Sequence, residues 1–441
     1  SSSSSSSSSS SLYYIISFIL LSSLSVFTTI YISTISTNDP YFYQNEFNLT
    51  QIASLSKNKT FVITGANAGL GYSSTKLLSI AGEADLIVMA CRTLSKCRDA
   101  RDEIMSTVQA TRRCYDKTNS NNGRDDSDGD YVIHAGGHSD NDDCEADRGP
   151  DVKNITNDGA CIAHRHGFQM KPTLVVLELD LASLQSIKKF SVELQDVLWE
   201  QGKGDISRES PKIDVLINNA GIMCCPYEII KPMNTEIQMA VNHIGHFALT
   251  SLLLKNLENG GRIVNVSSLA GAFGFFLDWD DVNYTKERRL FFRQYFTTLQ
   301  SIAAYGASKR ANQIFTHGLD KKLSHRGIDA VVAHPGYSRT ALMMNGWSFA
   351  SNFVKKLAKN NVVLSMSSDD GSLPQLRAAL DVEHVKSDSY VAPLGFTMGR
   401  PVVVGTSIKS FHHFFWSVMD ENAEIQSLWE YSETAIGWSF D

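Results

Sequence analysis

The chain has 441 residues, of which 43% are hydrophobic, so it is long enough for one large core or two ordinary ones. Its formal net charge of −7 argues against nucleic acid as a partner, because phosphate recognition needs a basic face. Its seven cysteines do not have the spacing of a small disulfide scaffold, and we interpret most of them as free thiols.

The first 58 residues form three segments of different composition. Residues 1–11 are a low-complexity serine tract. Residues 12–32 carry no charge, and their length is about that needed to cross a bilayer, which predicts a transmembrane anchor. A cleaved signal peptide is the alternative, although no basic residue precedes the segment. The polar residues 33–58 are predicted to be a linker.

Short apolar runs alternate with helical patterns through residues 59–441, as expected of repeated βα units. The runs predicted to be strands are 61–63, 86–89, 174–177, 215–217, 263–266 and 330–333. Strands this apolar suit a parallel sheet that is covered by helices on both faces. We therefore predict a single α/β domain at 59–441 with a doubly wound, Rossmann-like parallel sheet.

A glycine-rich turn follows the first predicted strand, in the sequence TGANAGLG at residues 64–71. Such a turn lets the backbone approach a pyrophosphate, while the N-terminus of the next helix supplies N–H donors. The residues predicted to bind a dinucleotide here are Gly65, Asn67, Gly69, Leu70 and Gly71.

Two residues after later strands bear on the adenosine half of that dinucleotide. Arg92 stands at the end of the second strand, where a carboxylate would bind the ribose diol, so its guanidinium favours NADP(H) over NAD. A surface arginine without this role is the alternative. Asp180, after the third strand, either contacts the adenine edge or caps the next helix.

The stretch at about 112–170 interrupts the βα alternation and is rich in Asp, Asn and Gly. Its acidic residues and its four histidines (His134, His138, His164 and His166) would suit a cation or metal site. We predict a solvated, disordered insertion instead, because few apolar residues there could fix ligand geometry. No metal site is predicted.

Tyr305 and Lys309 lie four residues apart, which places a phenol and an ammonium on one face of a helix. Hydride transfer to a carbonyl builds negative charge on its oxygen, so an acid must stand beside it. We predict that Lys309 lowers the pKa of Tyr305 from its usual value near ~10 and hydrogen-bonds the nicotinamide ribose. Ser268 would donate to the substrate oxygen. Together with the glycine turn, these residues predict a nicotinamide-dependent oxidoreductase.

From Thr60 onwards the chain resembles the short-chain dehydrogenase/reductase superfamily, and within it the microsomal retinol dehydrogenase branch. The resemblance is carried by NNAGIMCCPY at 218–227, VNHIGHF at 241–247, DWDD at 278–281, YGASK at 305–309, HPG at 334–336 and LWEYSE at 428–433. It implies a catalytic tetrad of Asn242, Ser268, Tyr305 and Lys309. In that tetrad Tyr305 is the acid/base and Asn242 holds a water in a relay to Lys309.

The resemblance also implies further residues around the cofactor. Ser267 is kept as the alternative to Ser268. The further cofactor-binding residues are Asn218, Ala220, Gly221, Pro335, Gly336 and Thr340, of which Asn218 would support the sheet and Thr340 would meet the nicotinamide carboxamide. The substrate side is expected from Tyr337–Ser387. The aromatic run Phe411–Trp416 is either a lipophilic rim of that side or a core helix or dimer contact.

The resemblance implies NADP(H)-dependent interconversion of a lipophilic aldehyde or ketone and its alcohol, at the endoplasmic reticulum membrane, with a homodimer possible. Protochlorophyllide reductases share several of these motifs, so a plastid pigment enzyme is an alternative. They typically carry cysteine where this chain has Tyr337, which argues against it. A non-catalytic dinucleotide-binding scaffold is the second alternative, and a cleaved signal would place the protein on the secretory route.

Overall fold

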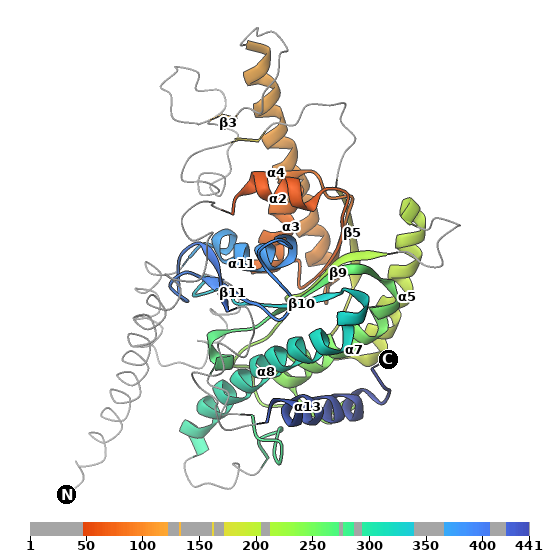
Figure 1. The fold of residues 1–441 in the computed structure, drawn as a ribbon, viewed down its shortest axis with the longest axis vertical. Coiled ribbons are helices and arrows are strands. Elements are labelled where there is room, and N and C mark those ends of the chain that lie inside the picture. Colours follow the sequence, from red (N-terminus) through yellow and green to blue (C-terminus); the bar gives the residue numbers. More distant parts are fainter. Residues whose placement is uncertain are drawn as a thin grey trace, which may run out of the picture.

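The computed structural model describes nine parts of the chain: residues 47–121, 132–133, 161–162, 172–203, 212–272, 277–285, 293–338, 366–405 and 420–440. Within them, one large sheet lies between two layers of helices (Figure 1). The serine tract, the apolar segment 12–32, Thr340, the aromatic run Phe411–Trp416 and most of the acidic insertion lie outside the described residues.

Eight strands form the sheet, in the order β12-β11-β10-β9-β6-β1-β2-β5. They are β1 (Thr60–Thr64), β2 (Leu86–Cys91), β5 (Thr173–Glu178), β6 (Ile213–Asn218), β9 (Leu257–Val266), β10 (Asp329–Ala333), β11 (Tyr390–Pro393) and β12 (Pro401–Gly405). All pairs are parallel except β11 with β12, which is antiparallel. The doubly wound parallel sheet and its six predicted strands are thus confirmed. The strand order reverses between β1 and β6, the place where such sheets bind ligands.

The helices divide between two hydrophobic cores, one on each face of the sheet (Figure 1). One face carries α2 (Leu49–Ser56), α3 (Gly69–Ala81), α4 (Leu94–Asn121) and α11 (Ser368–Leu380). The other carries α5 (Leu184–Leu198), α7 (Gly245–Leu253) and α8 (Arg293–Leu323), with α13 (Glu421–Ile436) packed on α8. Short pieces complete the fold: β3 (Val132–Ile133), β4 (Cys161–Ile162), β7 (Ile229–Ile230), β8 (Thr235–Glu236), α6 (Ile237–Met239) and the π-helical turn η4 (Ala240–Ile244).

Two predicted boundaries need correction. Part of the expected linker 33–58 is helix α2, which begins with a capping box in which Asn48 and Gln51 each bond the other's backbone N–H. Its apolar face, including the fully buried Ile52, packs into the same core as α3, which a linker would not do. Helix α4 continues to Asn121, and β3 pairs with β4, so parts of the range from about 112 to 170 are regular structure.

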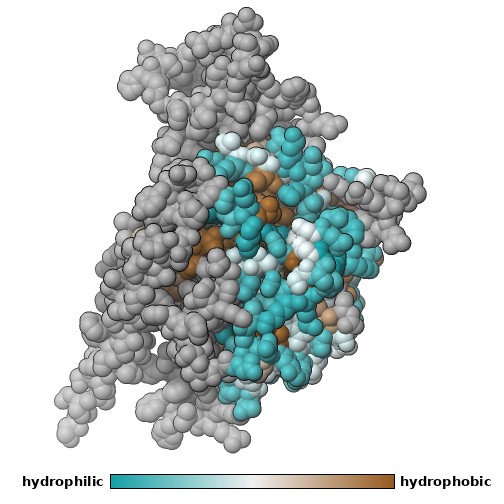
Figure 2. Space-filling model, viewed as in Figure 1, coloured by the Kyte–Doolittle hydropathy of each residue, from teal (hydrophilic) through white to brown (hydrophobic). Residues whose placement is uncertain are grey.

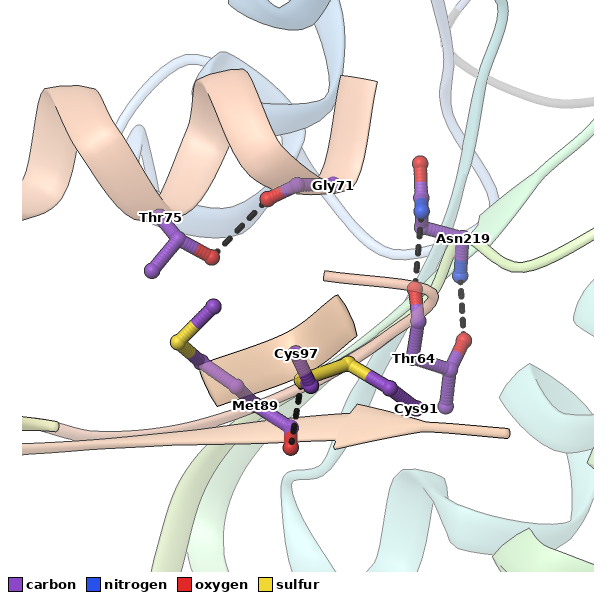
Figure 3. Close-up of a disulfide and its surroundings, with 7 residues drawn as sticks. All are labelled: Thr64, Gly71, Thr75, Met89, Cys91, Cys97 and Asn219. Carbon is purple, nitrogen blue, oxygen red and sulfur yellow. Dashed lines mark hydrogen bonds between the residues drawn. A yellow bond between two sulfur atoms is a disulfide. The ribbon is translucent and has the colours of Figure 1, made fainter. Parts of the chain in front are cut away.

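A disulfide joins Cys91, the last residue of β2, to Cys97 in α4 (Figure 3). Our interpretation of most cysteines as free thiols is therefore wrong for this pair. The strand end and the helix start that follows it bring the two side chains together, and both are buried. Cys224 and Cys225 are free thiols.

Hydrophilic residues cover most of the described surface in one view, with apolar residues showing in smaller areas between them (Figure 2). Among the described residues, no helix combines the length and apolar character that a membrane crossing requires.

Candidate active site

The glycine turn after β1 has the backbone shape that its sequence predicts. Gly65 and Gly69 have φ of +68° and +56°, a left-handed conformation that glycine adopts without strain. Helix α3 begins at Gly69, and its N-cap Ala68 makes no side-chain capping bond. The helix therefore offers backbone N–H groups and a positive dipole end to an anion, which fits the pyrophosphate of a dinucleotide.

Gly71 packs this turn closely and provides a direct test of it. A Cβ atom at this position would lie 2.5 Å from the carbonyl oxygen of Gly65 and 2.6 Å from Nδ2 of Asn219. We expect Gly71→Ala to weaken dinucleotide binding at least about tenfold and to lower the free energy of unfolding by about 1–3 kcal/mol, because backbone atoms must shift. Fluorescence titration and thermal unfolding would measure the two effects, and Gly71→Ser should be worse. Unchanged binding in both variants would contradict this account of the turn.

The loop after β6 is fastened to the glycine turn through Thr64 (Figure 3). The Thr64 hydroxyl accepts from the backbone N–H groups of Asn219 and Ala220, each at 2.9 Å, and the Asn219 amide donates to the Thr64 carbonyl at 2.7 Å. A Cβ on Gly65 would lie 3.0 Å from Cα of Ala220. Asn218 is buried and its amide donates to Asn265 at 2.8 Å, so it joins β6 to β9.

Arg92 and Asp180 lie at the carboxyl ends of the neighbouring strands β2 and β5, where the sequence predicts the adenosine half of the dinucleotide. Arg92 is exposed directly after β2. Asp180 does not cap α5, because the N-cap of that helix is Ser183, which accepts from Ser186. The Asp180 carboxylate instead accepts from the N–H of Ala182 at 3.0 Å. The capping alternative is therefore wrong, while its adenine contact stays a prediction.

Tyr305 lies on α8 with only 8% of its surface exposed and is hydrogen-bonded to the side chain of Ser268. Burial raises the pKa of Tyr305 to about 12, and the bond to Ser268 opposes that shift. Lys309 is not among the causes, and its Nζ lies 5.9 Å from the centre of the phenol ring. The expectation that Lys309 lowers the pKa of this phenol is therefore wrong for the described structure, where desolvation dominates.

Lys309 is almost completely buried beside the carboxyl end of β9. Burial lowers the pKa of Lys309 to about 8, and its Nζ donates to the carbonyl oxygen of Val266 at 2.9 Å. Ser267 donates to the backbone carbonyl of Lys309 at 2.8 Å and accepts from Gln313. Ser267 therefore holds strand and helix together, whereas Ser268 faces the phenol.

Asn242 joins the turn η4 to α8 and to residues 219–222 of the loop after β6, called the cofactor loop below for its predicted role. Its side-chain oxygen accepts from the N–H of Ile222 at 2.8 Å, and its amide donates to the Ile222 carbonyl and to Ser308. A Cβ on Gly221 would lie 3.2 Å from Oδ1 of Asn242 and 3.4 Å from Nζ of Lys309. The cofactor loop and two predicted tetrad residues therefore meet at Gly221.

The turn after β10 is the last part of the predicted site within the described residues. Gly336 has φ of +69°, and a Cβ there would lie 2.6 Å from the carbonyl oxygen of Thr397. Pro335 accepts a bond from Ser338 at 2.6 Å. The sequence prediction did not single out Thr64 or Asn219 as binding residues, although both stand in the motifs that it quoted. No cluster of three potential metal ligands occurs among the described side chains.

Comparison with known proteins agrees with this arrangement. A family model described as short chain dehydrogenase matches residues 162–278. Human retinol dehydrogenase 13 is 32% identical over 286 residues, which cover 64% of this chain and 60% of the relative. Mouse retinol dehydrogenase 14 is 33% identical over 290 residues, covering 65% and 64%. These matches show that the chain is similar to short-chain dehydrogenases. Its resemblance to the retinol dehydrogenase branch is confirmed.

Two further matches complete the comparison with this superfamily. Short-chain dehydrogenase TIC 32 A, chloroplastic, from Brassica napus is 32% identical over 192 residues, which cover 40% of this chain and 51% of the relative. A crystal structure of an uncharacterized protein from Mycobacterium Paratuberculosis superposes with a TM-score of 0.53 at 26% identity, covering 88% of this chain and 98% of the other. The chain spans about three fifths of the length of the first two retinol dehydrogenases named above.

Proposed function

We propose that this protein reduces a lipophilic aldehyde or ketone with NADPH, and oxidises the corresponding alcohol in the reverse direction. The observation that carries the proposal is the Tyr305 phenol, hydrogen-bonded to Ser268 and on the same helix face as Lys309. Lys309 in turn lies beside Gly221, in the loop that is hydrogen-bonded to Thr64 at the glycine turn. The names of the retinol dehydrogenases support a lipophilic substrate.

In the mechanism, the bound cofactor supplies or removes a hydride, and the protein manages charge and protons. A phenol whose pKa is about 12 stays protonated at neutral pH, so Tyr305 donates to the substrate oxygen as negative charge develops there. Ser268 provides a second donor to the same oxygen. Lys309 is an ammonium below about pH 8 and supplies positive charge beside the site. Asn242 would hold the water that relays a proton towards Lys309.

Arg92 is the basis for proposing NADP(H) over NAD(H), because its exposed guanidinium can bind a phosphate on the adenosine ribose. We expect Arg92→Ala to weaken NADPH binding about 10- to 100-fold and to change NADH binding less than threefold. Titration of both cofactors would measure this preference. Arg98→Ala, which removes another exposed arginine from α4, is the matched control and should leave the preference unchanged. An equal loss for both cofactors in Arg92→Ala would refute this role.

We also propose that residues 12–32 anchor the protein in the endoplasmic reticulum membrane, on the strength of their uncharged length. A plastid location is the alternative, supported by the chloroplastic relative. Expression of the full chain and of a variant lacking residues 1–46, followed by carbonate extraction of membranes, would test the anchor. Release of the full chain by carbonate would refute it.

A substrate screen tests the proposed function as a whole. Purified full-length protein would be assayed with retinal, a steroid ketone and a fatty aldehyde, each with NADPH and NADH, in the dark. We expect NADPH oxidation with at least one lipophilic carbonyl. Turnover only of protochlorophyllide in light would favour the pigment-reductase alternative. Cofactor binding without oxidation of any of these substrates would favour a non-catalytic scaffold and would overturn the proposal.

A further inference from the structure

His246 lies between the glycine turn and the predicted tetrad, in the first turn of α7, and only 1% of its surface is exposed. Its Nδ1 lies 3.0 Å from the backbone carbonyl oxygen of Asn242. Its Nε2 lies 2.9 Å from the hydroxyl of Thr64. The imidazole therefore spans the distance from the end of β1 to the turn η4 that carries Asn242.

The chemistry of these two partners determines which ring nitrogen carries the proton. A carbonyl oxygen can only accept, so Nδ1 of His246 must carry the hydrogen. In the neutral ring Nε2 is then an acceptor, and the Thr64 hydroxyl must donate to it. The lone pairs of that hydroxyl remain free for the N–H groups of Asn219 and Ala220, which both point at it from 2.9 Å. Each of these hydrogen bonds thus has one donor and one acceptor. The Ile217 carbonyl oxygen, at 3.4 Å, is a more distant acceptor for the same Thr64 hydrogen.

The ring is suited to this single arrangement throughout the neutral pH range. Burial lowers the pKa of His246 to about 4, and the charge of Lys309 acts in the same direction. A protonated ring would present a second donor to Thr64, which would then have to turn its own hydrogen elsewhere. Gly245, the preceding residue, allows α7 to approach Leu181 closely, since a Cβ there would lie 2.4 Å from the carbonyl oxygen of Leu181.

We propose that His246 is a positioning residue that couples the cofactor loop to the tetrad. On one side, its ring is bonded to Thr64, which in turn binds the loop that contains Ala220. On the other side, its Nδ1 orients the carbonyl of Asn242. The side chain of Asn242 is bonded to the backbone of Ile222 and to Ser308 of α8. This inference rests on the proposed function, since it assigns a role within the same site. Reacting groups misplaced by about 1 Å can lose about 100-fold in rate, so a small shift of this turn is sufficient.

His246→Asn tests the coupling because its shorter amide can still donate towards the Asn242 carbonyl but does not reach Thr64. We expect kcat to fall about 10- to 100-fold while the Kd for NADPH changes less than threefold. The matched control is His243→Asn, which alters another fully buried histidine, one that is bonded to Ser432 of α13 and not to the cofactor turn. That control should keep kcat within about threefold of wild type even if its Tm falls.

A double-mutant cycle separates coupling from general destabilisation. Thr64→Val removes the hydroxyl from the other end of the same bond. If the two residues act through that bond, the double variant Thr64→Val/His246→Asn should have a kcat no more than about threefold below that of the less active single variant. The proposal would be overturned if the loss of kcat in the double variant equalled the product of the two single losses. It would also be overturned if His246→Asn kept the wild-type kcat.

A measurement on the unaltered protein makes the inference testable even if no variant folds. Nitrogen-15 NMR of labelled histidines at pH 7 should show the ring of His246 as the neutral Nδ1–H tautomer. Its signals would be assigned by their absence from the spectrum of His246→Asn or through their contacts. A protonated Nε2 would refute the bridge. Because this readout does not need a substrate, a chain that shows the tautomer but no turnover would refute the proposed function alone.

Discussion

Tyr305→Phe is expected to lower kcat/KM at least about 1,000-fold while NADPH binds within about threefold of its wild-type affinity. General acid catalysis by a positioned side chain contributes about 10²- to 10⁴-fold, and the substitution removes only the hydroxyl. The phenyl ring stays in place, so the buried volume around α8 is nearly conserved. Initial rates with the best substrate and fluorescence titration of NADPH would measure the two quantities.

Tyr431→Phe is the matched control for this experiment. Burial raises the pKa of Tyr431 to about 12, as it does for Tyr305, but its hydroxyl bonds Thr235 at 3.0 Å from α13. Removal of that hydroxyl should therefore affect stability and leave kcat within about threefold. Near-normal turnover in Tyr305→Phe would mean that another group donates the proton, and it would remove the basis of the proposed mechanism.

The sequence predicted the central strands well because their residues carry a strong local signal. Runs such as 86–89 and 215–217 consist only of apolar residues, which suits a parallel sheet between two helical layers. The strands β11 and β12, at one side of the sheet, were missed, and proline or glycine stands at their ends: β11 ends at Pro393, and β12 begins at Pro401 and ends at Gly405. Helix α2 was missed although Asn48 and Gln51 form a capping box, because its segment is polar overall.

The sequence predicted which residues form the site but not how the fold shifts their pKa values. Motif spacing placed Ser268, Tyr305 and Lys309 in one group, and they do lie together. The direction of the Tyr305 pKa shift depends on burial, which no local pattern reveals, and the bond to Ser268 is what opposes it. The tautomer of His246 likewise depends on partners 4 and 182 positions away in the chain, which only the folded structure brings together.

Lys309→Met is expected to lower kcat at least about 100-fold and yet to increase stability at pH 7 by about 2 kcal/mol. Burial lowers the pKa of Lys309 from 10.5 to about 8, so at pH 7 the folded chain keeps a charge in a site that disfavours it. Loss of the ammonium does not leave the Val266 carbonyl without a donor, because the Asn312 amide also donates to it at 3.2 Å. Methionine fills a similar volume without charge.

The pH dependence of this stability difference separates it from a packing effect. Between pH 8 and 10.5 the unfolded wild-type chain still binds a proton that the folded chain has released, so wild-type stability gains from rising pH. The advantage of Lys309→Met should accordingly be full below about pH 8 and shrink as the pH approaches 10.5. In activity, the wild type should lose turnover above about pH 8, where the ammonium is deprotonated.

Lys76→Met provides the opposite case in the same fold. Lys76 is buried too, but its Nζ lies 2.8 Å from a carboxylate oxygen of Asp369, so its removal leaves a partly buried anion without this partner. We expect this variant to be destabilised by about 3 kcal/mol at pH 7. Denaturant unfolding of both variants from pH 7 to 10 would measure the contrast. If Lys309→Met were also less stable than the wild type at every pH from 7 to 10, the fold would stabilise the charge of Lys309. The account of Lys309 as a catalytic ammonium that burial disfavours would then be refuted.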